Sequence, residues 1–318
     1  MTRTVLLGPG WLGAPTAQHL AAMGHQTWVV GRQSRPARFD TVTSDAASIP
    51  PIVVTADLLS ESGSDALRHD LPAAADHLVV CVAPATARGE DYAVYPRLAA
   101  ASARLANQLG VRSVVYVSST GIYDRTDGSL VDEYSPIVAE SPRVRALLDA
   151  EEAIASAGSA RCAVHVLRVA GLYGPGRDPS ARFRSPPHAP TALSGRPADS
   201  DTLPNEEWCN FAWRDDVIAA IAHLLALTTH DAVHVFNCAD GHPVRANEIT
   251  AALPPLPHDA PQPSPRRARS NQRISVNALR ATGWIPAVPT IFHGLQLLGH
   301  PVPLPSELTD TSRTNRTT

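Results

Sequence analysis

Three glycines near the start of the chain, Gly8, Gly10 and Gly13, have the G-x-G-x-x-G spacing of a phosphate-binding loop. They follow an apolar run at residues 5–7 and precede a helical pattern. In such a loop the first glycine permits a tight turn, the second admits a pyrophosphate, and the third lets helix and strand pack closely. Plain turns show this spacing too, but an apolar run at 27–30 completes a βαβ unit. The sequence therefore predicts a dinucleotide site with contacts from Gly8, Gly10, Trp11, Leu12 and Gly13.

The residues after the second apolar run indicate which nicotinamide dinucleotide is bound. In sites of this kind an acidic residue hydrogen-bonds the ribose 2′-hydroxyl of NAD, whereas arginine accommodates the 2′-phosphate of NADP. Residues 29–35 read Val-Val-Gly-Arg-Gln-Ser-Arg, with no acid and two arginines. Arg32 and Arg35 could each make bidentate, charge-assisted contacts with a phosphate. NADP is therefore favoured over NAD, and the alternative is two solvated arginines in an arginine-rich chain.

Further cofactor contacts are expected where two later apolar runs end. Residues 57–58 follow a run at 52–55, and residues 82–84 lie at the end of a run at 78–82. In open α/β sheets, ligands bind outside the carboxyl ends of the strands. The cofactor contacts predicted from these ends are Asp57, Leu58, Val82, Ala83 and Pro84.

Strand and helix patterns alternate through the first two thirds of the chain. The strand candidates are short, rich in valine and apolar on both faces: residues 5–7, 27–30, 52–55, 78–82, 113–117 and 163–168. Helical patterns lie between them at residues 11–23, 66–69, 95–109 and 145–157. A helix, a strand and a short helix follow at 215–227, 232–238 and 246–253. This alternation predicts an α/β fold with a doubly wound parallel sheet.

The amino-acid composition of the chain changes after residue 176. Residues 177–204 are rich in Pro, Arg and Ser and are expected to form a long irregular loop. We expect a cofactor-binding domain over residues 1–176, with core strands also contributed from residues 210–240. An interleaved substrate-binding lobe would cover residues 177–302, and residues 303–318 would be a disordered tail.

Composition limits the classes of function. The 318 residues carry a formal net charge of −3, so nothing favours nucleic acid or an anionic membrane surface as a partner. No apolar run reaches the ~20 residues of a membrane span, and the amino terminus lacks a signal-peptide pattern. The four cysteines show no C-x-x-C spacing, which indicates the reducing cytoplasm rather than disulfides or a metal site. We expect a small-molecule substrate, and a homodimer is left open.

Several stretches together resemble the extended short-chain dehydrogenase/reductase superfamily, also called the NAD-dependent epimerase/dehydratase family. They occur in the family's order at residues 8–13, 57–58, 117–123, 167–176, 210–217 and 271–286. One departure is Trp213, which stands in place of the family's usual histidine. The resemblance implies a Rossmann-type fold with a smaller C-terminal substrate-binding part, and a nicotinamide cofactor.

The resemblance also identifies a catalytic position and a missing pair. Ser119, four residues before Tyr123, matches the hydroxyl residue that bonds the reacting oxygen; the alternative is a serine that bonds local backbone. In the family's Tyr-x-x-x-Lys motif, the lysine lowers the tyrosine pKa so that the phenol can act as acid or base. The alignment places Arg143 at the tyrosine and Leu147 at the lysine. Because the sequence contains no lysine, the pair is absent whatever the alignment.

Another group, or water, would have to deliver the proton. Side chains that could take part are Tyr92, Tyr95, Tyr123, His188 and Arg143. The tyrosines and the histidine could donate a proton, whereas Arg143 could stabilise a developing oxyanion. Each could equally be a buried hydroxyl or an exposed loop residue. Arg273 matches the arginine that sugar-nucleotide enzymes of the family place on the substrate diphosphate, and would anchor an anionic substrate or form a structural salt bridge.

The leading hypothesis is a cytoplasmic, NADP-dependent oxidoreductase that acts on a small carbonyl, hydroxyl or imine substrate with a non-standard proton donor. Its main rival is a catalytically silent NADP-binding protein that senses the cofactor or binds a partner. An epimerase that uses the cofactor transiently ranks below the reductase, because its chemistry also depends on the missing pair. Thr120 and Gly121 replace the Asp-Glu pair of the family's 4,6-dehydratases, so water elimination is not expected.

Overall fold

The computed structural model spans the whole chain, and the structure describes residues 1–32, 49–82, 92–183, 206–227, 232–254 and 270–304. Seven parallel strands form one sheet in the order β11-β7-β5-β4-β1-β2-β3. They are β1 (Arg3–Leu7), β2 (Gln26–Gly31), β3 (Ile52–Thr55), β4 (His77–Val80), β5 (Ser113–Ser119), β7 (Ala163–Val169) and β11 (Val233–Cys238). Every predicted strand overlaps one of these. The doubly wound, Rossmann-type α/β fold is confirmed.

The strand order reverses direction between β1 and β4. Leu7, the last residue of β1, is in register with Val30 of β2 on one side and Val80 of β4 on the other. In open α/β sheets the crevice at the carboxyl ends of such a pair takes the ligand. The glycine loop follows β1 directly and therefore lies in this crevice.

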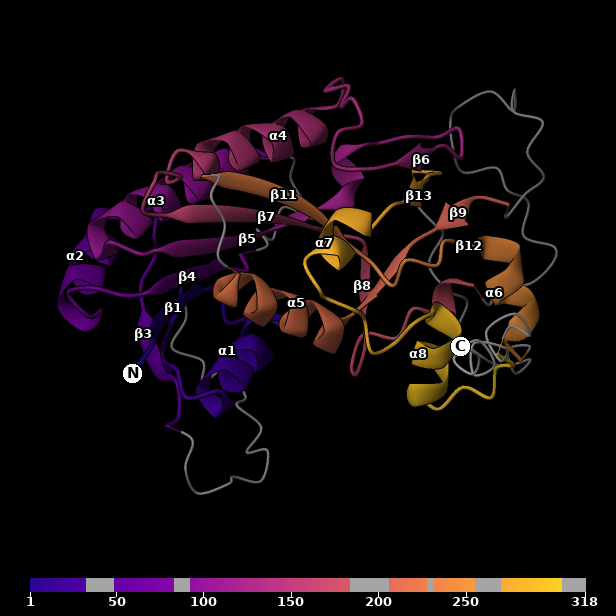
Figure 1. Ribbon diagram of the computed structural model, residues 1–318, viewed down its shortest axis with the longest axis horizontal. Helices are drawn as coiled ribbons and strands as arrows, with labels where there is room; N and C mark the ends of the chain where they lie inside the picture. The colour runs from indigo at the N-terminus through magenta and orange to yellow at the C-terminus, as the bar shows by residue number, and fades with distance from the viewer. Residues whose placement is uncertain (33–48, 83–91, 184–205, 228–231, 255–269, 305–318) are drawn as a thin grey trace, which may run out of the picture.

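Helices cover both faces of the sheet, because successive strand side chains point to opposite faces. One face is covered by α2 (Glu61–Asp70), α3 (Val94–Leu109) and α4 (Pro142–Ala155). The other is covered by α1 (Gly13–Ala22) and α5 (Arg214–Ala226), as Figure 1 shows. On β1, Val5 and Leu7 pack with the first group of helices and Leu6 packs with the second. This alternation buries the central strands of the sheet on both sides, whereas Ile52 and Val53 of the edge strand β3 are exposed.

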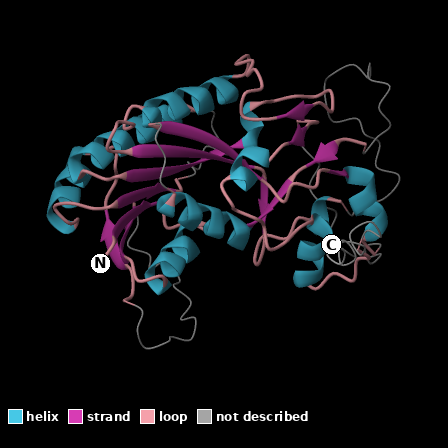
Figure 2. Cartoon of the chain, viewed as in Figure 1, coloured by secondary structure: helices cyan, strands magenta, loops and turns pink. Residues whose placement is uncertain are grey.

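A smaller part of the fold lies beyond the carboxyl ends of the central strands (Figure 2). Its strands pair as β8 (Gly171–Tyr173) with β10 (Phe211–Trp213), β9 (Trp208–Cys209) with β12 (Val244–Arg245), and β6 (Leu130–Val131) with β13 (Arg273–Ile274). The remaining elements are η1 (Thr120–Ile122), η2 (Ser180–Arg182), α6 (Ala246–Ala252), α7 (Asn277–Ala281) and α8 (Ile291–Leu297). A separate aromatic core holds much of this part together, including Tyr173, Phe211 and Trp213.

Two buried histidines sit within the central sheet without the solvation that a charged imidazole needs. His165 of β7 is fully buried against His234 and Phe236, and neither of its ring nitrogens has a hydrogen-bond partner. His77 of β4 is 3% exposed, and its Nδ1 is also unpartnered. Burial lowers the pKa of each imidazole from 6.5 to about 4, and Arg112 contributes to the shift at His77.

These histidines should make the fold less stable as the pH falls from 6.5 towards 4. The pKa of each imidazole is lower in the folded state, so the unfolded chain binds more protons between these pH values. Protonation therefore favours unfolding, and the fold has its full stability only above the unfolded pKa of histidine. Compared with neutral pH, each histidine should lower the free energy of unfolding by about 2 kcal/mol at about pH 5. Urea denaturation at about pH 7.5 and about pH 5 measures this change.

The comparison variant is His165→Phe, which keeps a ring in the core and removes one titrating group. Buried carboxyls such as Asp240, whose pKa burial raises, titrate with the opposite sign, so only the difference between wild type and variant isolates His165. The variant should lose less stability than wild type between the two pH values. An identical loss in both proteins would contradict the assignment.

Candidate functional site

Close contacts require glycine at two positions of the loop that follows β1. Gly8 has a φ of +95°, and a side-chain carbon there would come within 2.9 Å of the Cys81 carbonyl oxygen. A side chain at Gly13 would overlap the Gly8 carbonyl oxygen, so only glycine lets α1 approach the loop. Gly10 differs, because a side-chain carbon there would have nothing within 4 Å. The loop thus combines a tight turn, close helix packing and open space.

The residues after Gly10 complete the fit to a phosphate group. Trp11 is half-buried, and Leu12 packs into the core between the sheet and α1. No acidic side chain stands in the first turn of α1, so the positive end of the helix dipole is open to an anion. These residues fit the pyrophosphate of a dinucleotide.

Arg32 stands at the rim of this loop. It follows β2 directly, and its side chain is exposed. Gly31 packs under the loop, where a side-chain carbon would come within 2.5 Å of the Pro9 ring. The end of β2 therefore touches the glycine loop and brings Arg32 beside it. Arg35, the second arginine of the prediction, lies outside the described residues.

The predicted contacts after β3 and β4 are described in part. Asp57 is exposed, and its carboxylate accepts a hydrogen bond of 3.0 Å from the Leu59 amide, so it stabilises the turn before α2. Val82 is half-buried and lies two residues beyond the end of β4. Ala83 and Pro84 lie outside the described residues.

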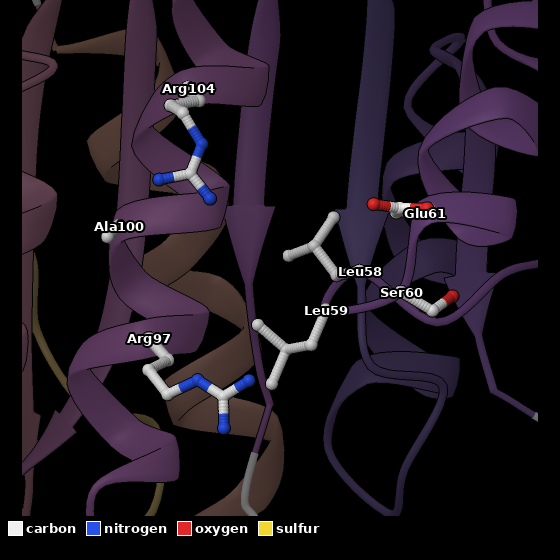
Figure 3. Close-up of a pocket in the computed structure, with 7 residues that line it drawn as sticks. All are labelled: Leu58, Leu59, Ser60, Glu61, Arg97, Ala100 and Arg104. Atoms are coloured by element: carbon white, nitrogen blue, oxygen red, sulfur yellow. The ribbon is translucent and has the colours of Figure 1, made fainter.

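Leu58 borders a pocket of about 330 Å³ between the loop after β3 and helix α3. In Figure 3 the guanidinium groups of Arg97 and Arg104 extend from α3 towards Leu58 and Leu59. Glu61 lines the opposite side. No sequence motif predicts that Arg97 and Arg104 lie near Leu58, because they reach this predicted cofactor contact only when α3 packs against the loop.

Ser119, Gly121 and Arg143 meet at the carboxyl end of β5. Ser119 Oγ accepts a hydrogen bond of 3.1 Å from the Gly121 amide, which uses a lone pair and leaves the hydroxyl hydrogen to donate. Arg143 Nη1 donates to the Gly121 carbonyl oxygen at 3.4 Å. A side-chain carbon at Gly121 would come within 2.9 Å of both terminal nitrogens of Arg143 and within 3.3 Å of Ser119 Oγ. A hydroxyl and a guanidinium therefore share the space beside Gly121.

The first turn of α4 positions Arg143 beside Gly121. Ser141 caps the helix by accepting a hydrogen bond from the Val144 amide, and Pro142 occupies the first helical position, where its missing N–H costs nothing. The Arg143 side chain is exposed, and among the described residues it has no carboxylate within ion-pair distance. Leu147, one turn further along, is buried. Arg143 can therefore interact with a ligand.

A buried polar network ties α4 to the sheet behind this space. Glu151 of α4 and Arg168 of β7, 7% and 4% exposed, form an ion pair with N–O distances of 2.7, 3.1 and 3.2 Å. Ser118 donates to Glu151 Oε1 at 2.5 Å, and Arg168 Nη1 donates to the Tyr123 hydroxyl at 2.9 Å. The Tyr123 hydroxyl donates to Asn237 Oδ1 at 2.8 Å. The network joins α4, β5, β7 and β11.

Tyr123, a predicted catalytic residue, has its hydroxyl inside this network. The side chain is 2% exposed, and its oxygen both donates and accepts a hydrogen bond. Burial raises the pKa of the Tyr123 phenol, and Arg168 only partly offsets that rise. A tyrosine that acts as acid or base near neutral pH needs the opposite shift. The structure favours the structural alternative for Tyr123.

The other proton-donor candidates are not joined to Ser119 by any contact among the described residues. Tyr92 and Tyr95 are half-buried around the start of α3. Tyr95 packs against the core between the sheet and α2, α3 and α4, and against a smaller apolar cluster that contains Ile122 and Leu147. His188 lies outside the described residues.

Arg273 is exposed and lies in the smaller part of the fold. Its Nε donates to the Gly128 carbonyl oxygen at 3.0 Å, and its Cζ lies 5.5 Å from the centre of the Trp208 ring. Among the described residues it forms no ion pair, so the salt bridge of the structural alternative is not present there. Its neighbour Gln272 is buried and donates to the Thr120 carbonyl oxygen at 3.0 Å, which links β13 to η1.

The described residues contain no candidate membrane span and no candidate metal site. No helix in these ranges is both long enough and apolar enough to cross a membrane. No group of three or more His, Cys, Asp or Glu residues in the same ranges could hold a metal ion.

Sequence comparison places this fold in a family. The chain matches the profile of the NAD dependent epimerase/dehydratase family over residues 5–239, which include the glycine loop, Ser119 and Arg143. The chain belongs to this family. Within it the chain is similar to protein YeeZ of Escherichia coli (strain K12), with 28% identity over 253 residues, 77% of this chain and 80% of YeeZ.

Solved structures show the same fold. UDP-glucose 4-epimerase of Thermus thermophilus, solved with NAD, superposes with a TM-score of 0.67 and 20% identity over 93% of this chain and 97% of the epimerase. MoeE5, solved with UDP-glucuronic acid and NAD, superposes with a TM-score of 0.67 and 21% identity over 92% of this chain and 95% of MoeE5. At these identities the likeness shows the fold alone.

Sequence reasoning missed the ion pair of Glu151 and Arg168, although one signal was available. Arg168 interrupts an apolar strand two residues after Val166 and four after Val164. Its side chain therefore points to the same face of the sheet as these two valines, the face that α4 covers. A charged side chain on that face would be buried, and a buried charge requires a partner of opposite sign.

Glu151→Gln should lower the free energy of unfolding by about 3–5 kcal/mol, because the Arg168 guanidinium would stay buried without a counter-charge. Urea denaturation at neutral pH measures the loss. The double variant Glu151→Leu/Arg168→Met removes both charges and should recover much of the stability. Equal stability of wild type and Glu151→Gln would contradict the role of the pair.

Proposed function

We propose that this family member is an NADP-dependent oxidoreductase that acts on a small carbonyl, hydroxyl or imine substrate. The observation that carries the proposal is the pairing of Ser119 and Arg143 beside Gly121, at the same edge of the sheet as the glycine loop. Two hydrogen-bond donors that lie beside the same glycine can together hold a substrate oxygen.

In this proposal the bound nicotinamide supplies or accepts the hydride. The Ser119 hydroxyl donates to the substrate oxygen while its own lone pair remains bonded to the Gly121 amide. Arg143 donates to the same oxygen and stabilises the negative charge that develops on it. The guanidinium thus replaces the phenol that other family members place here, as an electrostatic group and not as a proton donor.

In this proposal the proton comes from water. A guanidinium keeps its proton at all accessible pH values, and the chain has no lysine to activate a tyrosine. The Tyr123 hydroxyl is enclosed in the buried network. A fixed positive charge favours an oxygen that becomes negative and disfavours a cationic iminium, so among the three substrate classes a carbonyl and its alcohol suit Arg143 best.

Arg32 supports NADP as the cofactor. It is exposed at the end of β2, where an acidic residue would hold the ribose of NAD. MoeE5 and the Thermus thermophilus epimerase were solved with NAD. We propose that this chain differs from them in its preference, because a cation at this position suits a 2′-phosphate.

Two other functions remain as outcomes of the tests. A silent NADP-binding protein would bind the cofactor without turnover. An epimerase is supported by the match to the NAD dependent epimerase/dehydratase family, and would interconvert two epimers without net consumption of NADPH. We retain a cytoplasmic location, a homodimer and a substrate-binding lobe over residues 177–302 as proposals.

Arg143→Ala should lower kcat for NADPH-dependent carbonyl reduction by about 100- to 1000-fold, because it removes a preorganised donor for the developing oxyanion. Arg143→Lys keeps the charge without the planar fork and should lie in between. Initial rates of NADPH oxidation over a panel of aldehydes and ketones measure the effect. Arg145→Ala, an exposed arginine on the same helix, should match wild type.

Ser119 provides an independent arm of this test. Ser119→Ala should lose about 100-fold in kcat, and Ser119→Thr, which restores a hydroxyl, should recover activity. Full activity of both Ser119→Ala and Arg143→Ala would refute the proposed site. Tight NADPH binding by wild type with no turnover on any substrate would favour the silent binder.

Arg32→Ala should weaken NADPH binding by about ten- to a hundredfold, because it removes a charge-assisted contact, and should leave NADH binding nearly unchanged. Calorimetric titration with each cofactor measures both affinities. Arg161→Ala, an exposed arginine before β7 and remote from the carboxyl edge, is the control. A wild-type preference for NADH would refute the NADP assignment.

A further inference from the structure

Trp11, the residue after Gly10, makes contacts that a glycine loop does not need in order to bind a dinucleotide. Its indole Nε1 donates to the Pro175 carbonyl oxygen at 2.9 Å. The Cζ atoms of Arg177 and Arg214 lie 4.5 and 5.3 Å from the centre of its ring. One indole thus holds two guanidinium groups beside the predicted pyrophosphate loop.

The turn at residues 174–177 is shaped to bring Arg177 there. Gly174 and Arg177 exchange two backbone hydrogen bonds of 3.2 and 2.8 Å. Gly174 has a φ of +151°, and a side-chain carbon at this position would come within 3.1 Å of Arg214 Cβ and 3.6 Å of the Trp11 ring. Glycine therefore lets the turn press against the indole and against the start of α5.

The described residues balance only one of the two positive charges at this cluster. Arg214 Nε pairs with the Asp215 carboxylate at 2.9 Å. Arg177 is exposed, and no carboxylate in the described ranges lies within ion-pair distance of it. The indole face attracts both cations without neutralising them. The cluster also stands beside the positive end of α1, so its local charge suits an anion.

We propose that Arg177, held by Trp11 and supported by Arg214, binds a phosphate or carboxylate group, and that this group is the pyrophosphate of the dinucleotide. The open space over Gly10 is one residue from Trp11, so a pyrophosphate on the loop lies beside the indole that carries Arg177. The inference rests on the proposed function only in requiring that a dinucleotide binds. It adds a further segment, the turn after β8, to the cofactor site.

Calorimetric titration of the purified full chain with NADPH, ADP-ribose and 2′-AMP tests this proposal. NADPH and ADP-ribose contain the pyrophosphate, whereas 2′-AMP reports on the adenosine end alone. Arg177→Ala and Arg177→Gln should weaken NADPH and ADP-ribose binding by about ten- to a hundredfold and leave 2′-AMP binding unchanged. Arg182→Ala, an exposed arginine in the following turn η2 that is not part of the Trp11 cluster, should bind all three ligands like wild type.

Three results would overturn the proposal. If both Arg177 variants bind NADPH and ADP-ribose like wild type but raise KM for the second substrate, the cluster holds a substrate anion. If they change only the melting temperature, the cluster is structural. If wild type binds none of the ligands, no dinucleotide site exists. Binding without turnover would refute the oxidoreductase and leave this inference standing, because the readout is affinity alone.

Discussion

Glu151 of α4 and Arg168 of β7 form an ion pair that is almost inaccessible to water. Each charge can be buried there only because the other compensates it. The pair fixes the helix on the sheet through contacts that also reach Ser118 and Tyr123. The first turn of the same helix carries Arg143 to Gly121. The position of the candidate oxyanion donor therefore depends on a buried ion pair two turns further along α4.

Under the proposed function, this arrangement lets the chain dispense with the tyrosine and the lysine of the family's usual motif. Arg143 lies where the resemblance places the tyrosine, and a buried leucine, Leu147, stands where it places the lysine. Gly121 leaves room for the guanidinium, since any side chain there would meet it. In this account a permanent cation replaces an activated acid, and the chemistry moves from proton transfer to electrostatic stabilisation.

The sequence was sufficient to predict the parallel sheet, because its apolar runs are short, valine-rich and separated by helical patterns, and Ser119 was named from a motif. The start of α2 at Glu61 was not predicted, because Ser60 caps it through the Gly63 amide outside the apolar pattern. The place of Arg168 in its strand indicates a buried charge, but neither its pairing with Glu151 nor the contact of Trp11 with Arg177 could be predicted. Such contacts join residues far apart in the chain, and their geometry exists only after the elements pack.

The most direct test of the central claim follows a labelled hydride. NADPH carrying deuterium at C4 of the nicotinamide would be incubated with the protein and a carbonyl panel, and the products analysed by mass spectrometry. The account predicts deuterium on the former carbonyl carbon of at least one product with wild type, and strongly reduced labelling with Arg143→Ala. NADPH bound tightly with no labelled product from any carbonyl, or equal labelling by the variant, would contradict it.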